Sequence, residues 1–432
     1  MTADKLMKLK KILVWFRNDL RLHDNEMLVE AIAKSDAILP VYFFDPRYFT
    51  QTTFETSKTG CNRAQFLRES AQALRTEFQR LGGDLLLLSG KPEELIPGIV
   101  EQYEISEVYH HREVGPEETG ISALVEDALW KQKINLKHFI GHTLYNKEDL
   151  PFPIRDIPDV FAQFKKKTER DAIVKSCFES PDQVHFVEND DWGTLPQLQD
   201  LGFTEAPMES ADSTFVGGEQ AGLQHISDLL AEHSAIYLKT TIKGGGDKFS
   251  SKLSAWLALG CLSPRKVYWL VKGAEQRFSS NNNFNQLLLG LLLRDYYRFM
   301  FKKHGIKFFQ EPGFEALIHT PEKPDDFALN QWKNGETGHQ MVDRYMKELN
   351  AHGFISHTAR LLVATYFVHV LKIHWTNGAA YFEEKLIDYS AASNWGNWAN
   401  VAGAGLDLKS KNMFDLEKQL KALELDLPDV SV

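Results

Sequence analysis

Two patterns of apolar residues divide the chain. In its first part, short apolar runs alternate with amphipathic stretches. The runs KILVWF, AILPVYFFD, DLLLLSG, EVYHHREV and NLKHFIGHTLY predict five strands between residues 11 and 145, with helices near 25–34, 63–81, 92–104 and 117–131. Strands that alternate with helices predict a mostly parallel sheet covered on both faces, with ligands at the carboxyl ends of its strands.

The second pattern is helical and follows a segment of weak periodicity. Residues 149–215 are rich in Pro, Asp and Ser and are expected to connect two domains, because so long a loop is unusual inside one. We therefore predict an α/β domain over 1–148, the connector, and an all-helical domain over 216–432. The expected fold class is α/β plus all-α, with a doubly wound, parallel, five-stranded, Rossmann-like sheet first.

One predicted helix, from Thr358 to His374, is apolar almost all round and is therefore expected inside a domain. It carries Arg360, and an unpaired buried charge costs several kcal/mol. Asp388, after the next predicted helix, is the nearest candidate partner. The pattern predicts a buried ion pair, or a ligand, at this point.

Charge and cysteine content narrow the function. A net charge of -10 over 432 residues argues against a protein whose whole surface grips duplex DNA, although a local basic groove stays open. The three cysteines form no C-x-x-C pair, so no disulfide framework or metal site is expected. No apolar run approaches the length of a membrane span, and the first residues lack a signal sequence. We expect a cytoplasmic protein.

A glycine-rich stretch suggests a site for an anion. In IKGGGDKFSSKLS, Ser250 and Ser251 can cap a following helix, whose first N–H groups favour a phosphate. A flexible loop explains the same residues. After the first strand comes RNDLRLHDN rather than G-x-G-x-x-G, which disfavours an ordinary dinucleotide dehydrogenase.

Longer phrases carry a family resemblance. LVWFRNDLRLHDN, LPVYFFDPRYF, GKPEELIP and YNKEDLPFPIRDIPDVFAQF resemble the photolyase and cryptochrome family, and in particular its DASH branch, in a match from Ile12 to about Lys418. The resemblance implies an FAD cofactor. It also implies that Arg360 and Asp388 pair at the edge of the flavin ring.

The resemblance assigns roles to further residues. Asn394 faces flavin N5, and Trp398 and Trp375, 23 residues apart, are the inner members of a tryptophan electron relay. A turn at Asn394 and core packing of both tryptophans are the alternatives. The FAD contacts implied in this way are Tyr237, Ser250, Ser251, Lys252, Leu253, Ser254, Arg294, Asp295, His357, Arg360, Asp388, Ser390, Asn394 and Asn397.

In this family the α/β domain carries an antenna chromophore, commonly methenyltetrahydrofolate (MTHF). Glu113 in HHREVGPEE matches the carboxylate that binds the pterin, a suitable acceptor for its paired N–H donors. A solvated Glu is the alternative. Tyr389 is expected to reach the antenna from the helical domain.

Departures from the family gather on the wall that faces flipped-out DNA. They are Thr241, Gly290, Leu293, His357, Thr358 and Asn400, where aromatic, acidic, cationic or amide groups are expected. Each aromatic clamp is worth roughly 1–3 kcal/mol per base, so their loss weakens binding of a pyrimidine dimer. Ser390 also replaces an Asp, and no tryptophan stands at the distal relay position near Glu322, Trp332 being the nearest in sequence.

These observations favour an FAD-dependent blue-light photoreceptor of the cryptochrome DASH type over an enzyme. The alternative is a deoxyribodipyrimidine photolyase, a carbon–carbon lyase that repairs cyclobutane pyrimidine dimers in single-stranded DNA. A light-independent nucleotide-binding protein is a third reading. Expected partners are FAD, weakly bound single-stranded DNA or RNA, and a signalling protein, for which the helical tail after Asp415 could be a docking segment.

Overall fold

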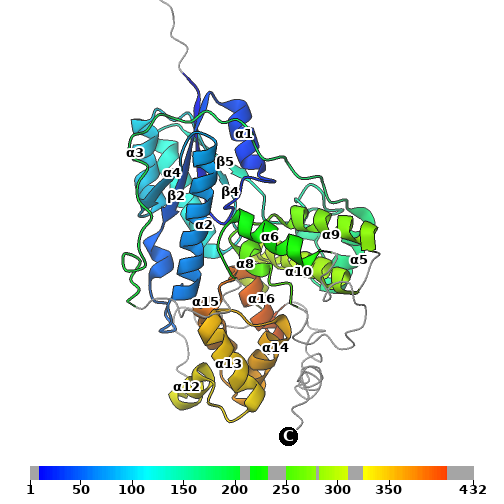
Figure 1. Cartoon of the computed structure of the whole chain (residues 1–432). Coiled ribbons are helices and arrows are strands. Elements are labelled where there is room, and N and C mark those ends of the chain that lie inside the picture. Colours follow the sequence, from blue (N-terminus) through cyan, green and yellow to red (C-terminus); the bar gives the residue numbers. More distant parts are fainter. Residues whose placement is uncertain (1–8, 205–214, 232–249, 279–281, 310–324, 406–432) are drawn as a thin grey trace, which may run out of the picture.

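The computed structural model describes residues 9–204, 215–231, 250–278, 282–309 and 325–405. The chain forms a sheet flanked by helices, followed by a group of helices that packs against one end of that sheet (Figure 1). The α/β part and the helical part both agree with the predicted fold class.

The sheet is parallel, with the strand order β3-β2-β1-β4-β5. Its strands are β1 (Lys11–Phe16), β2 (Ala37–Phe44), β3 (Leu86–Ser89), β4 (Glu107–His111) and β5 (Asn135–Phe139). The helices α1 (Glu26–Lys34) and α2 (Cys61–Arg80) pack on one face, and α3 (Pro92–Gln102) and α4 (Pro116–Lys131) on the other. All five strands and four helices lie where the apolar runs predict them, because each face of the sheet buries a continuous apolar layer.

The described part of the connector contains η2 (Ile154–Asp156) and α5 (Phe161–Asp171) and then returns along the sheet. The N–H of Ile38 on β2 donates to the carbonyl of His185 at 2.8 Å, and the N–H of Leu87 on β3 donates to the carbonyl of Trp192 at 3.0 Å. The connector thus satisfies backbone groups of the sheet besides joining the two parts.

The helical part contains α6 (Glu219–Leu229), α8 (Ser254–Ala258), α9 (Pro264–Phe278), α10 (Asn282–His304), η3 (Gly305–Phe308), α12 (Asp326–Asn334), α13 (Gln340–His352), α14 (His357–Thr365), η4 (Tyr366–Val370), α15 (Trp375–Lys385) and α16 (Ala391–Ala402). The expectation of one α-helix from Thr358 to His374 is wrong. After α14 the pattern changes to a π-helix, in which the N–H of Leu371 donates to the carbonyl of Tyr366. Lys372, with φ 58°, then turns the chain out of the helix.

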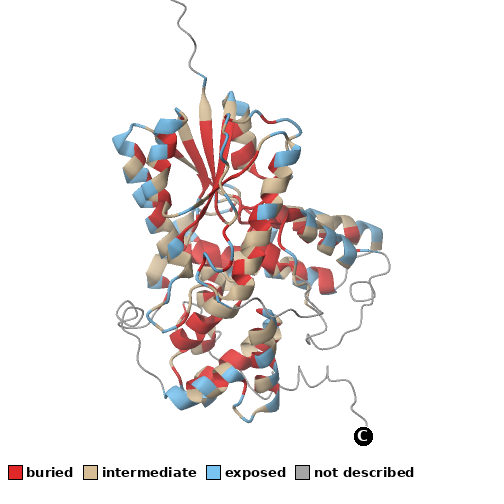
Figure 2. Cartoon of the chain, turned by 60° about the vertical axis from the view of Figure 1, so that its left-hand side comes forward, coloured by how far each residue is buried: buried red, intermediate tan, exposed pale blue. Residues whose placement is uncertain are grey.

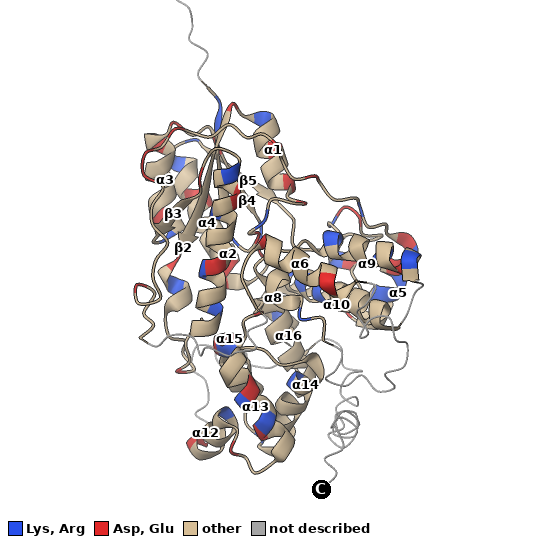
Figure 3. Cartoon of the chain, in the orientation of Figure 1, with Lys and Arg blue, Asp and Glu red and all other residues tan. Residues whose placement is uncertain are grey.

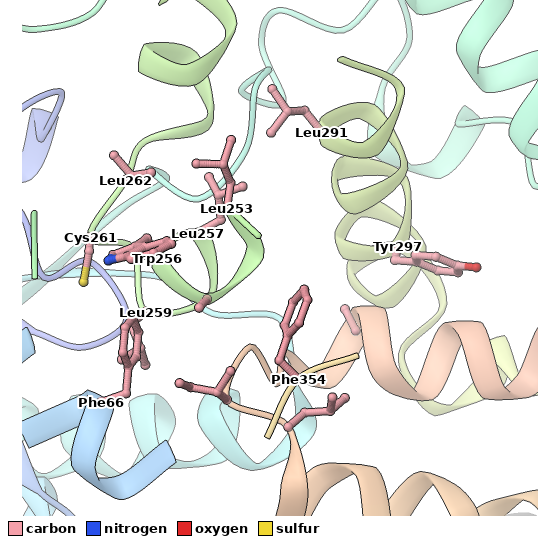
Figure 4. Packing of buried hydrophobic residues seen from close by; sticks show 14 of the residues in the cluster. Phe66, Leu253, Trp256, Leu257, Leu259, Cys261, Leu262, Leu291, Tyr297 and Phe354 are labelled. Carbon is pink, nitrogen blue, oxygen red and sulfur yellow. The ribbon is translucent and has the colours of Figure 1, made fainter. Parts of the chain in front are cut away.

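Buried residues continue from the sheet into the helical part without a break (Figure 2). Figure 4 shows one such junction, where Phe66 of α2 lies beside Trp256 of α8. Their ring centroids are 5.9 Å apart. Because the two parts share this core, their relative position is set by packing as well as by polar contacts.

Polar contacts at the same junction come from the loop after β1. The guanidinium of Arg21 is fully buried and donates to four carbonyls, those of His23, Asp24, Gly141 and Gly260. Two ion pairs, of Asp24 with Arg265 at 2.7 Å and of His23 with Glu219 at 2.6 Å, lie beside it. The loop RNDLRLHDN therefore joins the sheet to the helical part.

Gly260 has no substitute at this junction. Its φ is +66°, and a Cβ placed on it would lie 1.9 Å from the carbonyl oxygen of Asn18. We expect Gly260→Ala to lower the free energy of unfolding by about 1–3 kcal/mol, because it adds backbone strain and forces the loop away.

Chemical denaturation measures this loss. Gly273→Ala on α9 is the matched control, since nothing lies within 4 Å of its added Cβ. Alanine there should gain about 0.5–1 kcal/mol from the better helix propensity. Equal unfolding midpoints for Gly260→Ala and the wild type would contradict the assigned close approach.

Candidate functional site

A cavity of about 630 Å³ lies between the sheet and the helical part. We call it the interdomain cavity. Its walls come from the carboxyl ends of β1, β2 and β4, from the start of α4, and from α10, α15 and α16. The predicted location of a ligand at the carboxyl ends of the strands agrees with this position.

Glu113 lines the interdomain cavity but is already engaged by protein donors. Its Oε1 accepts from Nδ2 of Asn18 at 3.1 Å, and its Oε2 accepts from the guanidinium of Arg298 at 2.9 Å. Burial alone would raise the pKa of Glu113, but the neighbouring His142 and Arg298 hold it well below its usual range. Glu113 is therefore a charged carboxylate that joins α10 to the loop after β4.

Two other carboxyl groups that line the cavity have pKa values shifted in the opposite direction. Burial and the nearby charge of Glu113 raise the pKa of Glu118 to about 7. Burial likewise raises the pKa of Glu383, against the effects of Arg63 and a hydrogen bond from Tyr389. These groups are better placed than Glu113 to receive N–H donors of a ligand, because desolvated carboxyl groups gain most from such bonds.

The smaller cavity, of about 70 Å³ among the described residues, lies between α14, α15 and α16. Here Arg360 donates to Oδ2 of Asp388 at 2.9 Å and to the carbonyl of Ile355, so the predicted ion pair is present. The Oδ1 of Asp388 is buried and meets no donor within the described part of the chain. A buried acceptor without a partner is costly, and an N–H donor from a ligand would satisfy it.

Four other expected flavin residues and one relay tryptophan surround the same small cavity. Its lining includes His357, Ser390, Asn394, Asn397 and Trp398. The side chain of Asn394 is buried and donates to the carbonyl of Ala379, while Nδ2 of Asn397 donates to the carbonyl of Ser393. Desolvation and the neighbouring Arg360 lower the pKa of His357 to about 4, so this imidazole is neutral near pH 7.

Tyr389 and Ser390 line both cavities. The guanidinium of Arg63 lies over the ring of Tyr389, 4.6 Å from its centroid. The predicted reach of Tyr389 toward the α/β part thus has a geometric basis, and a two-residue wall separates the cavities.

The relay tryptophans have different ring neighbours. Trp398 is buried, and its described ring contacts are with Trp332, Phe367 and Phe382, at centroid distances of 6.2, 5.6 and 5.1 Å. Its ring also packs on the backbone of α15 at Gly378, one turn after Trp375. Trp398 therefore packs on α15, the helix that begins with Trp375.

Trp375 has its own aromatic neighbours. Its ring lies 5.6 Å from Phe309 and 5.8 Å from Trp395 by centroid distance. Trp332, which the sequence left unplaced, therefore packs against Trp398, whereas Trp395 packs against Trp375.

Several expected flavin residues lie elsewhere. Arg294 donates to the carbonyls of His142 and Leu257, and Asp295 accepts from the N–H groups of Leu144 and Tyr145, so this pair holds α10 against the loop after β5. Neither lines the small cavity.

The expected cap of α8 also differs. The residue before α8 is Leu253, its side chain is 1% exposed and packed in the core, and no side chain caps the helix. Ser251 instead accepts the N–H of Leu253 at 3.4 Å. Ser250, Lys252 and Ser254 are in the described part, whereas Tyr237, Thr241, the position near Glu322 and the tail after Asp415 lie outside it.

Sequence reasoning missed Glu118, Arg298, Glu383 and Trp395. Arg298 is separated from Glu113 by 185 residues, so no local pattern links them. Trp395 could have been noticed, because it stands three residues before Trp398 and such residues share a helix face.

Comparisons with known proteins agree with this architecture. Residues 12–182 match the model of the DNA photolyase family, and residues 287–426 match the model of the FAD binding domain of DNA photolyase. A protein from Gloeobacter violaceus named cryptochrome DASH is 41% identical over 424 residues, which are 97% of this chain and 84% of that relative.

The chain belongs to the photolyase and cryptochrome family.

Within this family the DASH branch is the one it resembles. The crystal structure of a Synechocystis cryptochrome superposes with a TM-score of 0.88 at 39% identity, covering 96% of this chain and 86% of that one. An Arabidopsis thaliana relative named cryptochrome DASH, chloroplastic/mitochondrial, is 36% identical and matches 94% of this chain and 72% of its own length.

Within the described ranges, no three His, Cys, Asp or Glu side chains are grouped so as to hold a metal ion. In the same residues, no helix is both long and apolar enough to cross a bilayer.

The state of Glu118 gives a pH-dependent prediction. Its pKa rises from 4.5 to about 7 on folding, so the stability associated with its neutral form is present below pH 4.5 and is lost as the pH rises through 7. Glu118→Gln removes that loss. We therefore expect the stability of this variant, relative to the wild type, to increase between pH 5 and pH 8 in denaturant unfolding.

Glu101→Gln is the control, because Glu101 is exposed on α3 and is not among the groups that shift the pKa of Glu118. Its difference from the wild type should be similar at both pH values. A constant difference for Glu118→Gln as well would refute the raised pKa.

Proposed function

We propose that this chain is an FAD-dependent blue-light photoreceptor of the cryptochrome DASH type, in which tryptophans supply the electron that reduces the flavin. The proposal rests on the small cavity. There Arg360 pairs with Oδ2 of Asp388, while the buried Oδ1 of Asp388 has no hydrogen-bond donor among the described residues. Trp398 lies in the same wall. The Arg360–Asp388 ion pair and the oxidisable indole of Trp398 thus line the same cavity.

The residues of the small cavity suit the edge of a flavin ring, although the cavity's volume of about 70 Å³ among the described residues is too small for a whole FAD molecule. Asp388 offers an acceptor to a ring N–H, and the guanidinium of Arg360 balances negative charge. FAD, when bound there, would supply blue-light absorption and one-electron acceptance. Asn394 carries an amide that can hydrogen-bond but has no acidic proton to give, so it should slow protonation of the reduced ring.

The protein's part in the reaction is to deliver electrons and exclude water. Trp398, 2% exposed, gives up an electron, and Trp375, 3% exposed, replaces it across the contact between α15 and α16. Burial of both rings keeps water from the charge while it moves. Arg360 then stabilises the added negative charge beside it.

We further propose that the interdomain cavity holds an antenna chromophore such as MTHF. Its volume of about 630 Å³ lies in the range of small-molecule sites. Glu118 and Glu383 are the lining carboxyl groups with raised pKa values, whereas Glu113 positions α10 through Arg298. Tyr389 would contact the chromophore from the helical side.

Trp398→Phe tests the photoreceptor proposal. Phenylalanine keeps a ring in the cavity wall but is much harder to oxidise, so FAD should stay bound while blue-light reduction in the presence of a thiol nearly stops. Absorbance at the flavin bands before and after illumination measures both. Photoreduction at the wild-type rate would exclude Trp398 as the donor.

The alternative activity, repair of pyrimidine dimers in single-stranded DNA, can be separated by restoring the missing groups. Gly290 on α10 is exposed, with nothing within 4 Å of an added Cβ, so Gly290→Glu combined with Leu293→Trp should fold. We expect this double variant to repair dimers several-fold faster than the wild type under blue light. A wild type that already repairs as fast would identify a photolyase with a rebuilt pocket.

Further parts of the proposal concern location and partners. The three cysteines are free thiols, which suits a reducing compartment, and we place the protein in the cytoplasm. Lys and Arg are interspersed with Asp and Glu over both parts (Figure 3), which favours weak binding of single-stranded DNA or RNA over a tight grip. We also propose a signalling protein that binds this chain in response to light.

A further inference from the structure

The electron relay of the proposed function has two assigned members, Trp398 and Trp375, and the question is which group comes next. Trp395 on α16 is the oxidisable ring that the described structure places against Trp375. The two indoles meet edge to face, with centroids 5.8 Å apart and an interplanar angle of 77°. Such contact is typical of packed aromatics and brings ring edges within a single short step.

Trp395 also reaches open space, which the other two relay members do not. Its side chain is half-buried and forms part of the wall of the interdomain cavity. Trp375 and Trp398 are 3% and 2% exposed. An electron vacancy that moves from Trp398 through Trp375 to Trp395 thus travels from the small cavity to the large one.

A competing route through Trp332 is less favourable. Trp332 contacts Trp398 at 6.2 Å but is fully buried, and its Nε1–H donates to the carbonyl of Val363, which is a poor proton acceptor. The next ring along this route, Tyr381, has the ammonium groups of Lys333 and Lys385 at 5.4 and 5.3 Å from its centroid. Two cations beside a ring oppose a further positive charge on it.

The surroundings of Trp395 provide for its proton. Nε1–H of Trp395 is directed at the hydroxyl oxygen of Tyr389 at 3.3 Å, and both residues hydrogen-bond to the carboxyl of Glu383. Arg63, over the ring of Tyr389, opposes oxidation of that phenol. Oxidation is therefore expected to stop at the indole, beside a carboxylate that can take its proton.

We propose that Trp395 is the third member of the relay and carries its oxidised end into the interdomain cavity. Trp395 gives one electron to oxidised Trp375, its Nε1–H bond breaks, and the proton passes to the Glu383 carboxylate, leaving a neutral indolyl radical. A small thiol that reaches the cavity then gives a hydrogen atom to the indolyl radical: the S–H bond breaks, the N–H bond re-forms, a thiyl radical leaves, and Glu383 releases its proton to solvent. This assignment rests on the proposed photoreceptor function.

The test compares Trp395→Phe with Trp130→Phe in FAD-loaded protein after a blue flash. Trp130 on α4 is 80% exposed and lines neither cavity, so it is the matched control. The long-lived tryptophan radical, followed by transient absorbance and electron paramagnetic resonance, should fall several-fold in Trp395→Phe and stay unchanged in Trp130→Phe. An unchanged radical in Trp395→Phe overturns the proposal.

A second measurement needs no radical spectroscopy. During long illumination in air without thiol, the exposed end of the relay should collect oxygen, and mass spectrometry of peptides locates it. We expect oxidation at Trp395 to exceed that at Trp375 and Trp332 and to vanish in Trp398→Phe. Oxidation concentrated at Trp332 would assign the other route.

Tyr389→Phe separates a positioning role from mere packing. It keeps the ring beneath Arg63 but removes the hydroxyl that orients Nε1–H of Trp395. The radical should still form, while its conversion from the cationic to the neutral spectrum should slow several-fold. An unaltered conversion rate would remove Tyr389 from the proton path.

The outcomes distinguish this inference from the proposed function. If blue light fails to reduce the flavin in the wild type, the photoreceptor proposal itself fails. If Trp398→Phe stops reduction but Trp395→Phe matches the wild type in radical yield and oxidation map, only the assignment of Trp395 is wrong.

Discussion

The buried polar loop after β1 is the constraint on which the interdomain cavity depends. Arg21 uses its donors on four carbonyls, and Asp24 with Arg265 forms an ion pair in which both side chains are at most 5% exposed. Removing one member of such a buried pair typically costs about 3–5 kcal/mol, because the other charge is left without compensation. The helical part can therefore take only one position on the sheet, and that position forms the interdomain cavity.

The two cavities differ in charge and are joined by two residues. The small one is governed by a single ion pair, Arg360 with Asp388, whereas the large one is bordered by carboxyl groups of unlike state. Tyr389 and Ser390 belong to both walls. An occupant of either cavity would therefore contact the same two residues.

The sequence predicted well where a pattern is local or a charge has one nearby partner. The strands and helices of the α/β part follow apolar periodicity. The ion pair of Arg360 with Asp388 was predictable because the helix of Arg360 carries few other polar groups. Predictions failed where the partner is distant. Asp295 binds backbone groups about 150 residues away, and the helix beyond Thr365 turns into a π-helix through backbone bonding that side-chain pattern does not encode.

The contacts of Arg21 also bear on how the protein is made. Gly260, whose carbonyl Arg21 needs, follows 239 residues later. At synthesis rates of roughly 5–20 residues per second, the loop waits on the order of 10–50 s before this partner leaves the ribosome. During that interval the guanidinium of Arg21 and the carboxyl end of the sheet, which are buried in the folded protein, are exposed to water. The nascent α/β part therefore exposes these polar and apolar groups until the helices that cover them have been made.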